Sequence, residues 1–71
     1  MSNEQRELPV PHDLQIELND DPAAAEAFAA LPRSHRREYV DWIVGARRAE
    51  TRASRIEKTL AMLVQKRRAE T

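Results

Sequence analysis

The helical hairpin predicted for this chain is encoded by residues 34–55, SHRREYVDWIVGARRAETRASR. Before Gly45, the apolar residues Tyr39 and Ile43 are four positions apart and therefore share one face of a helix. Glycine costs up to about 1 kcal/mol relative to alanine inside a helix, so this helix should end or bend near Gly45. A helical period resumes at Ala49. We therefore predict two antiparallel helices joined by a short, arginine-rich turn.

The second helix of this hairpin has the clearest apolar period in the sequence. Its stripe consists of Ala49, Ala53, Ile56, Leu60 and Leu63, which recur at i, i+4, i+7, i+11 and i+14. Lys66 and the two arginines after it suit the negative end of the helix dipole. We expect this helix to be regular as far as Lys66 and residues 67–71 to fray.

A first short helix is predicted to begin at Pro11, because proline suits the first position of a helix. Leu14 and Leu18 would then face the core. Residues 14–18 also alternate as a strand would, but no other segment could pair with such a strand, so helix is favoured. Residues 1–9 are polar and without a pattern, which predicts a disordered or weakly ordered tail.

A second short helix should follow Asp21, the expected N-cap, with Pro22 at its first position. Phe28 and Leu31 lie on the apolar stripe of this alanine-rich segment. Ser34 is the expected N-cap of the third helix.

Together these segments predict an all-α fold, a small bundle of four helices over residues 10–66, with helices three and four forming the antiparallel hairpin. A chain of this size buries only about 60% of its unfolded surface, so the core should be thin. The expected core residues are Leu14, Leu18, Phe28, Leu31, Tyr39, Trp42, Ile43, Ile56, Leu60 and Leu63.

The net charge of zero conceals a strong asymmetry. Residues 1–32 carry one base and seven acids, a charge of −6, whereas residues 33–71 carry eleven bases and five acids, a charge of +6. The acidic half could pair with the basic half inside the molecule, or a basic face could be kept for an anionic partner.

The composition argues against several classes of protein. Without cysteine there is no disulfide framework, and two histidines are too few for a structural zinc site, so we expect neither a metal nor another cofactor. No apolar run approaches the roughly 20 residues of a membrane span, and the N-terminal MSNEQRELPVP lacks the basic and apolar regions of a signal peptide. We expect a cytoplasmic protein without a transmembrane segment.

Sequence motifs for catalysis are missing. With one glycine there is no phosphate-binding loop, and neither a cysteine nucleophile nor a serine elbow is present. His35 and Glu38, three residues apart, could orient an imidazole, but a surface histidine in a first helical turn is more often inert. We therefore do not expect an enzyme and assign no catalytic residues.

The arginines are the strongest candidate binding residues. The candidates are Arg36, Arg37, Arg47, Arg48, Arg52 and Arg55. Arginines in a first helical turn oppose the helix dipole, so Arg36 and Arg37 require another explanation, such as pairing with Glu17, Asp20 or Asp21. Converging guanidinium groups suit carboxylate or phosphate oxygens, although a solvated face with packed stems is equally compatible with the pattern. We expect Arg52 to be bonded within the molecule and Arg48 and Arg55 to remain available.

Several segments together resemble a known family. They are Phe28-x-x-Leu31, then Ser34-His35-Arg36-Arg37-Glu38-Tyr39-Val40-x-Trp42-Ile43, then Ala46-Arg47-Arg48, then Glu50-Thr51-Arg52-x-x-Arg55-Ile56. The combination resembles the bacteriocin-protection, YdeI/OmpD-associated family over residues 10–66. The resemblance implies a C-terminal helical module, often following another domain. It also implies a link to tolerance of bacteriocins or cationic antimicrobial peptides and to an outer-membrane porin, with no established catalytic residues.

These observations predict a non-enzymatic interaction module. The arginine-rich corner between helices three and four would contact an acidic or phosphate-bearing protein partner. As the resemblance implies, this contact would serve bacteriocin tolerance or the response to envelope stress. The alternative is a nucleic-acid-binding protein, because a helix, a short turn and a basic helix superficially match a helix-turn-helix. Zero net charge and the acidic N-terminal half argue against nucleic acid. The partner's identity and the oligomeric state remain open.

Overall fold

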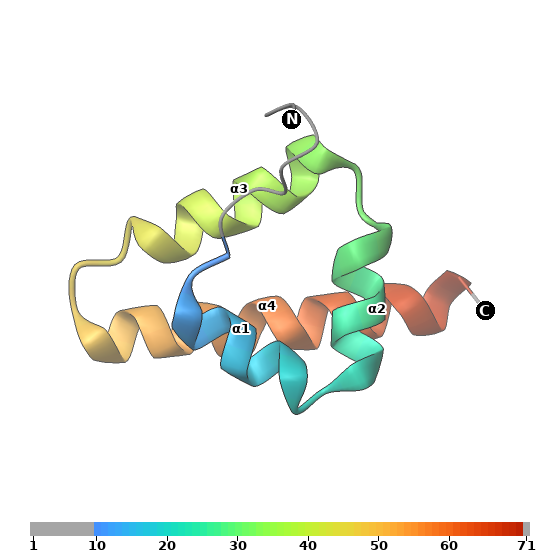
Figure 1. Cartoon of the computed structure of the whole chain (residues 1–71), viewed down its shortest axis with the longest axis horizontal. Coiled ribbons are helices and arrows are strands. Elements are labelled where there is room, and N and C mark those ends of the chain that lie inside the picture. The colour runs from blue at the N-terminus through green and yellow to red at the C-terminus, as the bar shows by residue number, and fades with distance from the viewer. Residues whose placement is uncertain (1–9, 71) are drawn as a thin grey trace, which may run out of the picture.

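The structure, a computed structural model, describes residues 10–70 and is all-α over that range (Figure 1). The four helices of the described range are α1 (His12–Asn19), α2 (Pro22–Ala30), α3 (Arg33–Val44) and α4 (Ala49–Glu70). The predicted all-helical fold is therefore confirmed. The tail predicted for residues 1–9 lies outside the described residues.

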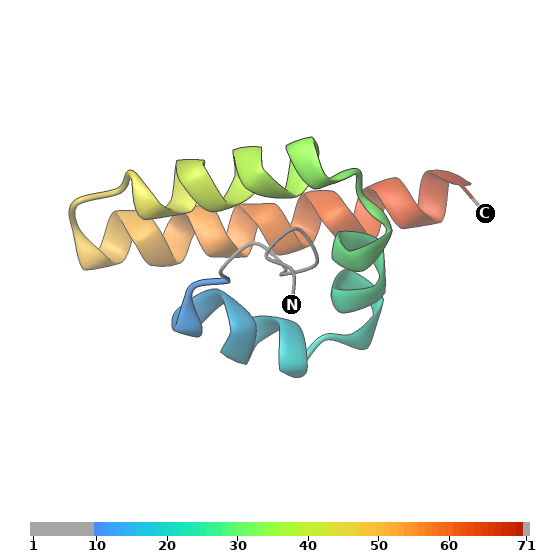
Figure 2. The same ribbon diagram turned by 45° about the horizontal axis from the view of Figure 1, so that its top comes forward.

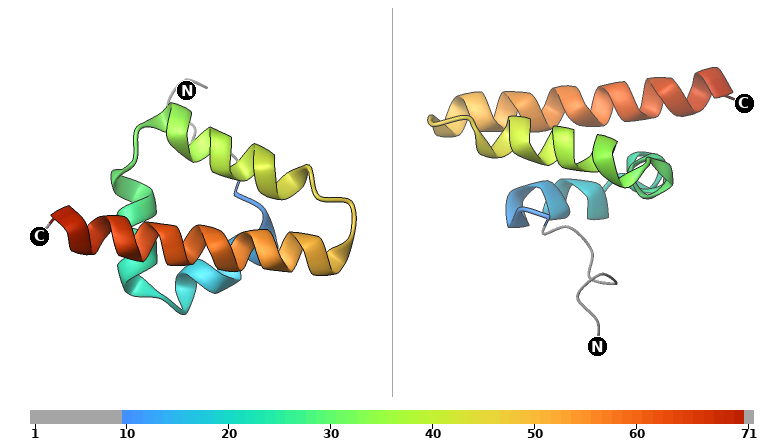
Figure 3. Two further views of the ribbon diagram at one scale, coloured as in Figure 1. Left: turned by 180° about the vertical axis from the view of Figure 1, so that it is seen from behind. Right: turned by 90° about the horizontal axis from the view of Figure 1, so that it is seen from above.

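The longest helix, α4, is the spine of the fold and contacts each of the other three. Helix α3 runs beside it in the opposite direction, which confirms the antiparallel hairpin (Figure 2). Helices α1 and α2 follow one another at an angle on the same side of α4, as the view from above shows (Figure 3). The core therefore lies where α1 and α2 pack against the hairpin.

Prolines and a glycine lie at the boundaries of the helices. The Asp21 carboxylate accepts a hydrogen bond from the Ala24 N–H at 3.2 Å, and Pro22 is the first residue of α2, as predicted. Helix α3 ends at Val44, directly before Gly45.

The predicted Ser34 cap is wrong. Helix α3 begins one residue earlier, at Arg33, with Pro32 as the N-cap and no side-chain cap. The Pro32 carbonyl accepts the first hydrogen bonds of the helix, from the N–H groups of His35 and Arg36, so Ser34 already lies inside the first turn.

Among the described residues, ten side chains are buried: Leu14, Leu18, Ala24, Ala27, Phe28, Leu31, Ile43, Ile56, Thr59 and Leu63. Tyr39 and Leu60, also expected in the core, are partly buried and pack against it. Thr59 is fully buried, and its hydroxyl donates to the Arg55 carbonyl at 2.8 Å. The one buried polar side chain in the described part of the chain is thereby satisfied.

Trp42 was predicted in the core, but 38% of its surface is exposed. The next residue, Ile43, is fully buried. Successive helical residues are about 100° apart around the axis, so a helix that points Ile43 inward turns Trp42 to the side.

Helix α4 continues to Glu70, past Lys66, where fraying was expected to begin. Arg67 Nη2 lies 2.7 Å from Glu26 Oε1, so an ion pair links the last turns of α4 to α2. This pair and that between Asp13 and Arg52 join the acidic half of the sequence to the basic half. Within residues 10–70, no helix has the length and apolarity that crossing a membrane requires.

Candidate functional site

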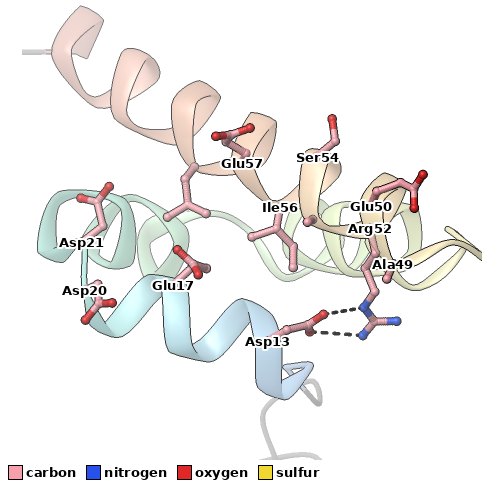
Figure 4. A pocket seen from close by; sticks show the side chains of 12 residues that line it. Asp13, Glu17, Asp20, Asp21, Ala49, Glu50, Arg52, Ser54, Ile56 and Glu57 are labelled. Carbon is pink, nitrogen blue, oxygen red and sulfur yellow. Dashed lines mark hydrogen bonds and ion pairs between the residues drawn. The ribbon is translucent and has the colours of Figure 1, made fainter.

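Arg52 is bonded within the molecule. Its Nε donates to Asp13 Oδ2 at 2.6 Å and its Nη2 donates to Asp13 Oδ1 at 3.2 Å (Figure 4). These hydrogen bonds favour the carboxylate and lower the pKa of Asp13, and they raise the pKa of Arg52. The pair joins the first turn of α1 to the first turn of α4, so Arg52 is used to position α1.

Arg55 was expected to remain available, but it too is bonded. Its Nη1 donates to the Trp42 carbonyl at 2.6 Å, and its guanidinium carbon lies 5.2 Å from the centre of the Trp42 ring. The carbonyls in the last turn of a helix have no partner within that helix. Arg55 therefore caps the end of α3 and holds the Trp42 ring against α4.

Arg36 caps the end of α2 in the same way that Arg55 caps the end of α3. Its Nη1 donates to the carbonyls of Leu31 at 2.9 Å and Ala29 at 3.2 Å, at the end of α2. This bonding accounts for an arginine in the first turn of α3 despite the opposing dipole. Arg37 is different: its Nε lies 3.8 Å from Asp41 Oδ2, and both side chains are about 70% exposed. Such exposed pairs contribute little.

The two remaining arginines lie in the turn between α3 and α4. Arg47 and Arg48 are exposed and form no side-chain hydrogen bond or ion pair with the rest of residues 10–70. The six predicted binding arginines therefore do not converge on one site. We refer to Arg47 and Arg48 as the arginine corner.

A groove that the sequence did not predict lies between α1 and α4 (Figure 4). It has a volume of about 780 Å³. Its charged lining residues are Asp13, Glu17, Asp20, Asp21, Glu50, Glu57 and Arg52. Ile56 and Leu60 add apolar surface. We refer to it as the acidic groove.

Most of these carboxylates are not neutralised. Arg52 pairs with Asp13, and Asp21 caps α2. The other four, Glu17, Asp20, Glu50 and Glu57, form no ion pair within residues 10–70. The high number of acidic residues in the first half of the sequence was the signal that could have indicated an acidic groove. The two acidic residues that α4 adds to the groove could not be predicted, because their position depends on how α1 packs against α4.

The described region holds no cluster of metal-ligating side chains, and the histidine and glutamate that the sequence singled out do not pair. Within residues 10–70, no three His, Cys, Asp or Glu side chains are grouped to hold a metal ion. His35 and Glu38 are exposed on α3 and are not hydrogen bonded to each other.

Comparison with known proteins identifies the family. The model of the family described as bacteriocin-protection, YdeI or OmpD-associated matches residues 7–66. The uncharacterized protein YdeI of Bacillus subtilis (strain 168) is 38% identical over 56 residues, which cover 79% of this chain and 28% of that protein. This chain thus spans little more than a quarter of that relative, and no solved structure matches it. The chain belongs to the bacteriocin-protection, YdeI/OmpD-associated family.

Proposed function

We propose that this chain is a non-enzymatic binding module whose arginine corner contacts an acidic or phosphate-bearing protein partner. The observation that carries the proposal is the isolation of Arg47 and Arg48. Both are exposed and have no partner within residues 10–70, whereas Arg52 and Arg55 are bonded a turn or two away. Guanidinium groups bind carboxylates and phosphates through two parallel hydrogen bonds, so two adjacent ones suit such a partner.

The surroundings of the corner support this role. Arg55 fixes the end of α3, and the pair of Arg52 with Asp13 fixes the start of α4. The turn that carries Arg47 and Arg48 is therefore held at both sides. A surface that is already ordered loses less conformational entropy on binding.

A second candidate is recognition of a cationic peptide in the acidic groove. Carboxylates that form no ion pair within residues 10–70 stand on both walls, Glu17 on α1 and Glu57 on α4, and the groove also has apolar surface (Figure 4). A peptide that combines basic and apolar side chains would complement both features. The family description names bacteriocin protection, and binding of a bacteriocin or another basic peptide in the acidic groove would be consistent with that description.

The nucleic-acid alternative has less support. The helices of a helix-turn-helix cross at about 90–120°. Here α3 and α4 lie side by side in opposite directions (Figure 2). The net charge of zero also lacks the basic balance of a duplex-binding domain. These features favour a protein partner.

The test is affinity capture from the source cell at low and moderate salt. The Arg47→Glu/Arg48→Glu variant should lose acidic or phosphorylated proteins that the parent captures. The matched control, Arg33→Glu/Lys58→Glu, changes the charge equally at exposed residues outside the corner and should retain them. Equal capture by both variants would contradict the arginine corner as the contact surface.

The same experiment separates the other candidates. If the Asp20→Lys/Glu57→Lys variant, and not the arginine-corner variant, fails to capture a basic peptide or protein that the parent captures, the acidic groove is supported as the binding site. Sequence-selective duplex binding at nanomolar concentration and physiological salt, measured by gel shift, would instead favour the nucleic-acid alternative.

A further inference from the structure

A second groove lies on the hairpin itself. It has a volume of about 480 Å³, and its lining residues are Leu31, His35, Glu38, Tyr39, Trp42, Met62 and Lys66. Apart from Leu31, which caps the end of α2, all of them lie on α3 or α4. Seen from behind, α3 and α4 lie on the near side of the molecule without another described helix over them (Figure 3). We refer to this surface as the hairpin groove.

The hairpin groove exposes side chains that are typical of protein interfaces. Trp42 is 38% exposed and Met62 is 42% exposed, and Tyr39 lies beside them partly buried. Tryptophan, tyrosine and methionine are enriched at interfaces, and the two aromatics are frequent hot spots. Arg55 holds the Trp42 ring in place, so this anchor is positioned before a partner arrives.

The charges on the groove walls are self-complementary. Glu38 stands on α3 and Lys66 on α4, both are exposed, and neither forms an ion pair within residues 10–70. In a two-fold symmetric interface, each residue contacts on the partner the residue that contacts it in return. A two-fold axis passing between Glu38 and Lys66 would place each Glu38 opposite the Lys66 of the other copy.

From this surface we infer that the chain forms a symmetric dimer through the hairpin groove. Trp42, Tyr39 and Met62 of the two copies cover one another, and two Glu38–Lys66 pairs flank them. The net charge of zero adds no long-range repulsion between copies. The interface includes neither the arginine corner nor the acidic groove, so this inference and the proposed function can fail independently.

The first experiment is sedimentation velocity of the intact chain from micromolar to millimolar concentration. The mass should rise from 8.2 kDa toward twice that value. Emission from the single tryptophan should shift to shorter wavelength over the same range as Trp42 becomes buried. Met62→Lys should weaken the dimer at least about tenfold, because it places two further bases in the interface. Ile16→Lys changes a similarly exposed apolar residue on α1 and should leave the dimer intact.

Charge reversal provides a second test that does not disturb the apolar surface. Glu38→Lys and Lys66→Glu should each weaken self-association, because each brings like charges together in the symmetric dimer. When the two variants are mixed, one copy carries two bases and the other two acids, so a heterodimer should form. Circular dichroism verifies that both variants are folded.

Three results would overturn the inference. One is a parent that remains at 8.2 kDa at millimolar concentration, which would leave a different protein as the occupant of the groove. Another is equal weakening by Met62→Lys and Ile16→Lys. The third is a mixture of folded Glu38→Lys and Lys66→Glu chains that stays monomeric.

Discussion

Phe28 and Trp42 show how differently two aromatic side chains are used in so small a fold. Both were expected in one core, yet Phe28 is 7% exposed and Trp42 is 38% exposed. Phe28 projects from α2, which packs across α4, whereas Trp42 lies at the side of α3 in the hairpin groove. Helical phasing finds apolar side chains that share a face, but only the packing of the helices decides which face is covered.

The arginines show the same division between an inner and an outer region. Arg36, Arg52 and Arg55 satisfy carbonyl or carboxylate groups where helices meet. Arg47 and Arg48 lie only a few residues away in the turn and have no such partner within residues 10–70. Clustering of arginines in the sequence therefore does not by itself define a binding site.

The largest expected effect contrasts the two aromatics. Phe28→Ala should lower the free energy of unfolding by about 3 to 5 kcal/mol, because it removes a buried ring and leaves a cavity. A core of this size rarely supplies more than about 3 to 5 kcal/mol in total, so the variant should be close to unfolded. Trp42→Ala should cost much less, since its side chain is partly in solvent. Urea unfolding at low protein concentration measures both, and equal losses would contradict the division.

A smaller effect contrasts two arginines. Arg52→Ala should lower the unfolding free energy, because it removes both hydrogen bonds that hold Asp13 on α1. Arg52→Lys should fall between the alanine variant and the parent, since lysine keeps the charge but not the two parallel bonds. Arg48→Ala should leave stability unchanged. The same urea titrations apply, and a destabilised Arg48→Ala beside an unaffected Arg52→Ala would reverse the assignment.

Local signals in the sequence account for most of the fold. Three of the helices have a proline at their start, namely Pro11, Pro22 and Pro32, and α3 ends directly before Gly45. The apolar period identified α4. These signals act over a few residues, where propensity and backbone restriction dominate. The exact helix boundaries were predicted less accurately, since the N-cap of α3 is Pro32 rather than Ser34.

The candidate sites depended on contacts that the sequence does not display. The pairing of Asp13 with Arg52 spans 39 residues, and the bonds from Arg36 to the end of α2 require a particular angle between two helices. The acidic groove likewise requires α1 to lie along α4. The sequence indicated that charges of both signs were present, but not which of them would meet.

The smallest expected effect tests the Asp13–Arg52 contact through pH. Hydrogen bonding to Arg52 lowers the pKa of Asp13 in the folded chain below its ordinary value of 3.8. A lowered pKa stabilises the folded state at pH values above 3.8, and this contribution disappears as the pH falls through the lower, folded pKa. The parent should therefore be more stable than Asp13→Asn near neutral pH, and its advantage should shrink as the solution is acidified below about pH 4.

Comparison of the parent with Asp13→Asn isolates this contribution, because every other carboxylate titrates in both proteins. Asparagine can still accept the Leu14 N–H that Asp13 accepts at 3.0 Å, so the variant keeps this backbone contact and loses the charge and the second acceptor oxygen that face Arg52. Unfolding free energies from urea titrations at several pH values give the difference directly. The same difference should be smaller between Arg52→Ala and its Asp13→Asn double variant, since the guanidinium that lowers the pKa of Asp13 most is then absent and only the backbone N–H groups still lower it. A parent advantage that is independent of pH, or that grows on acidification, would show that Arg52 does not stabilise the ionised form of Asp13.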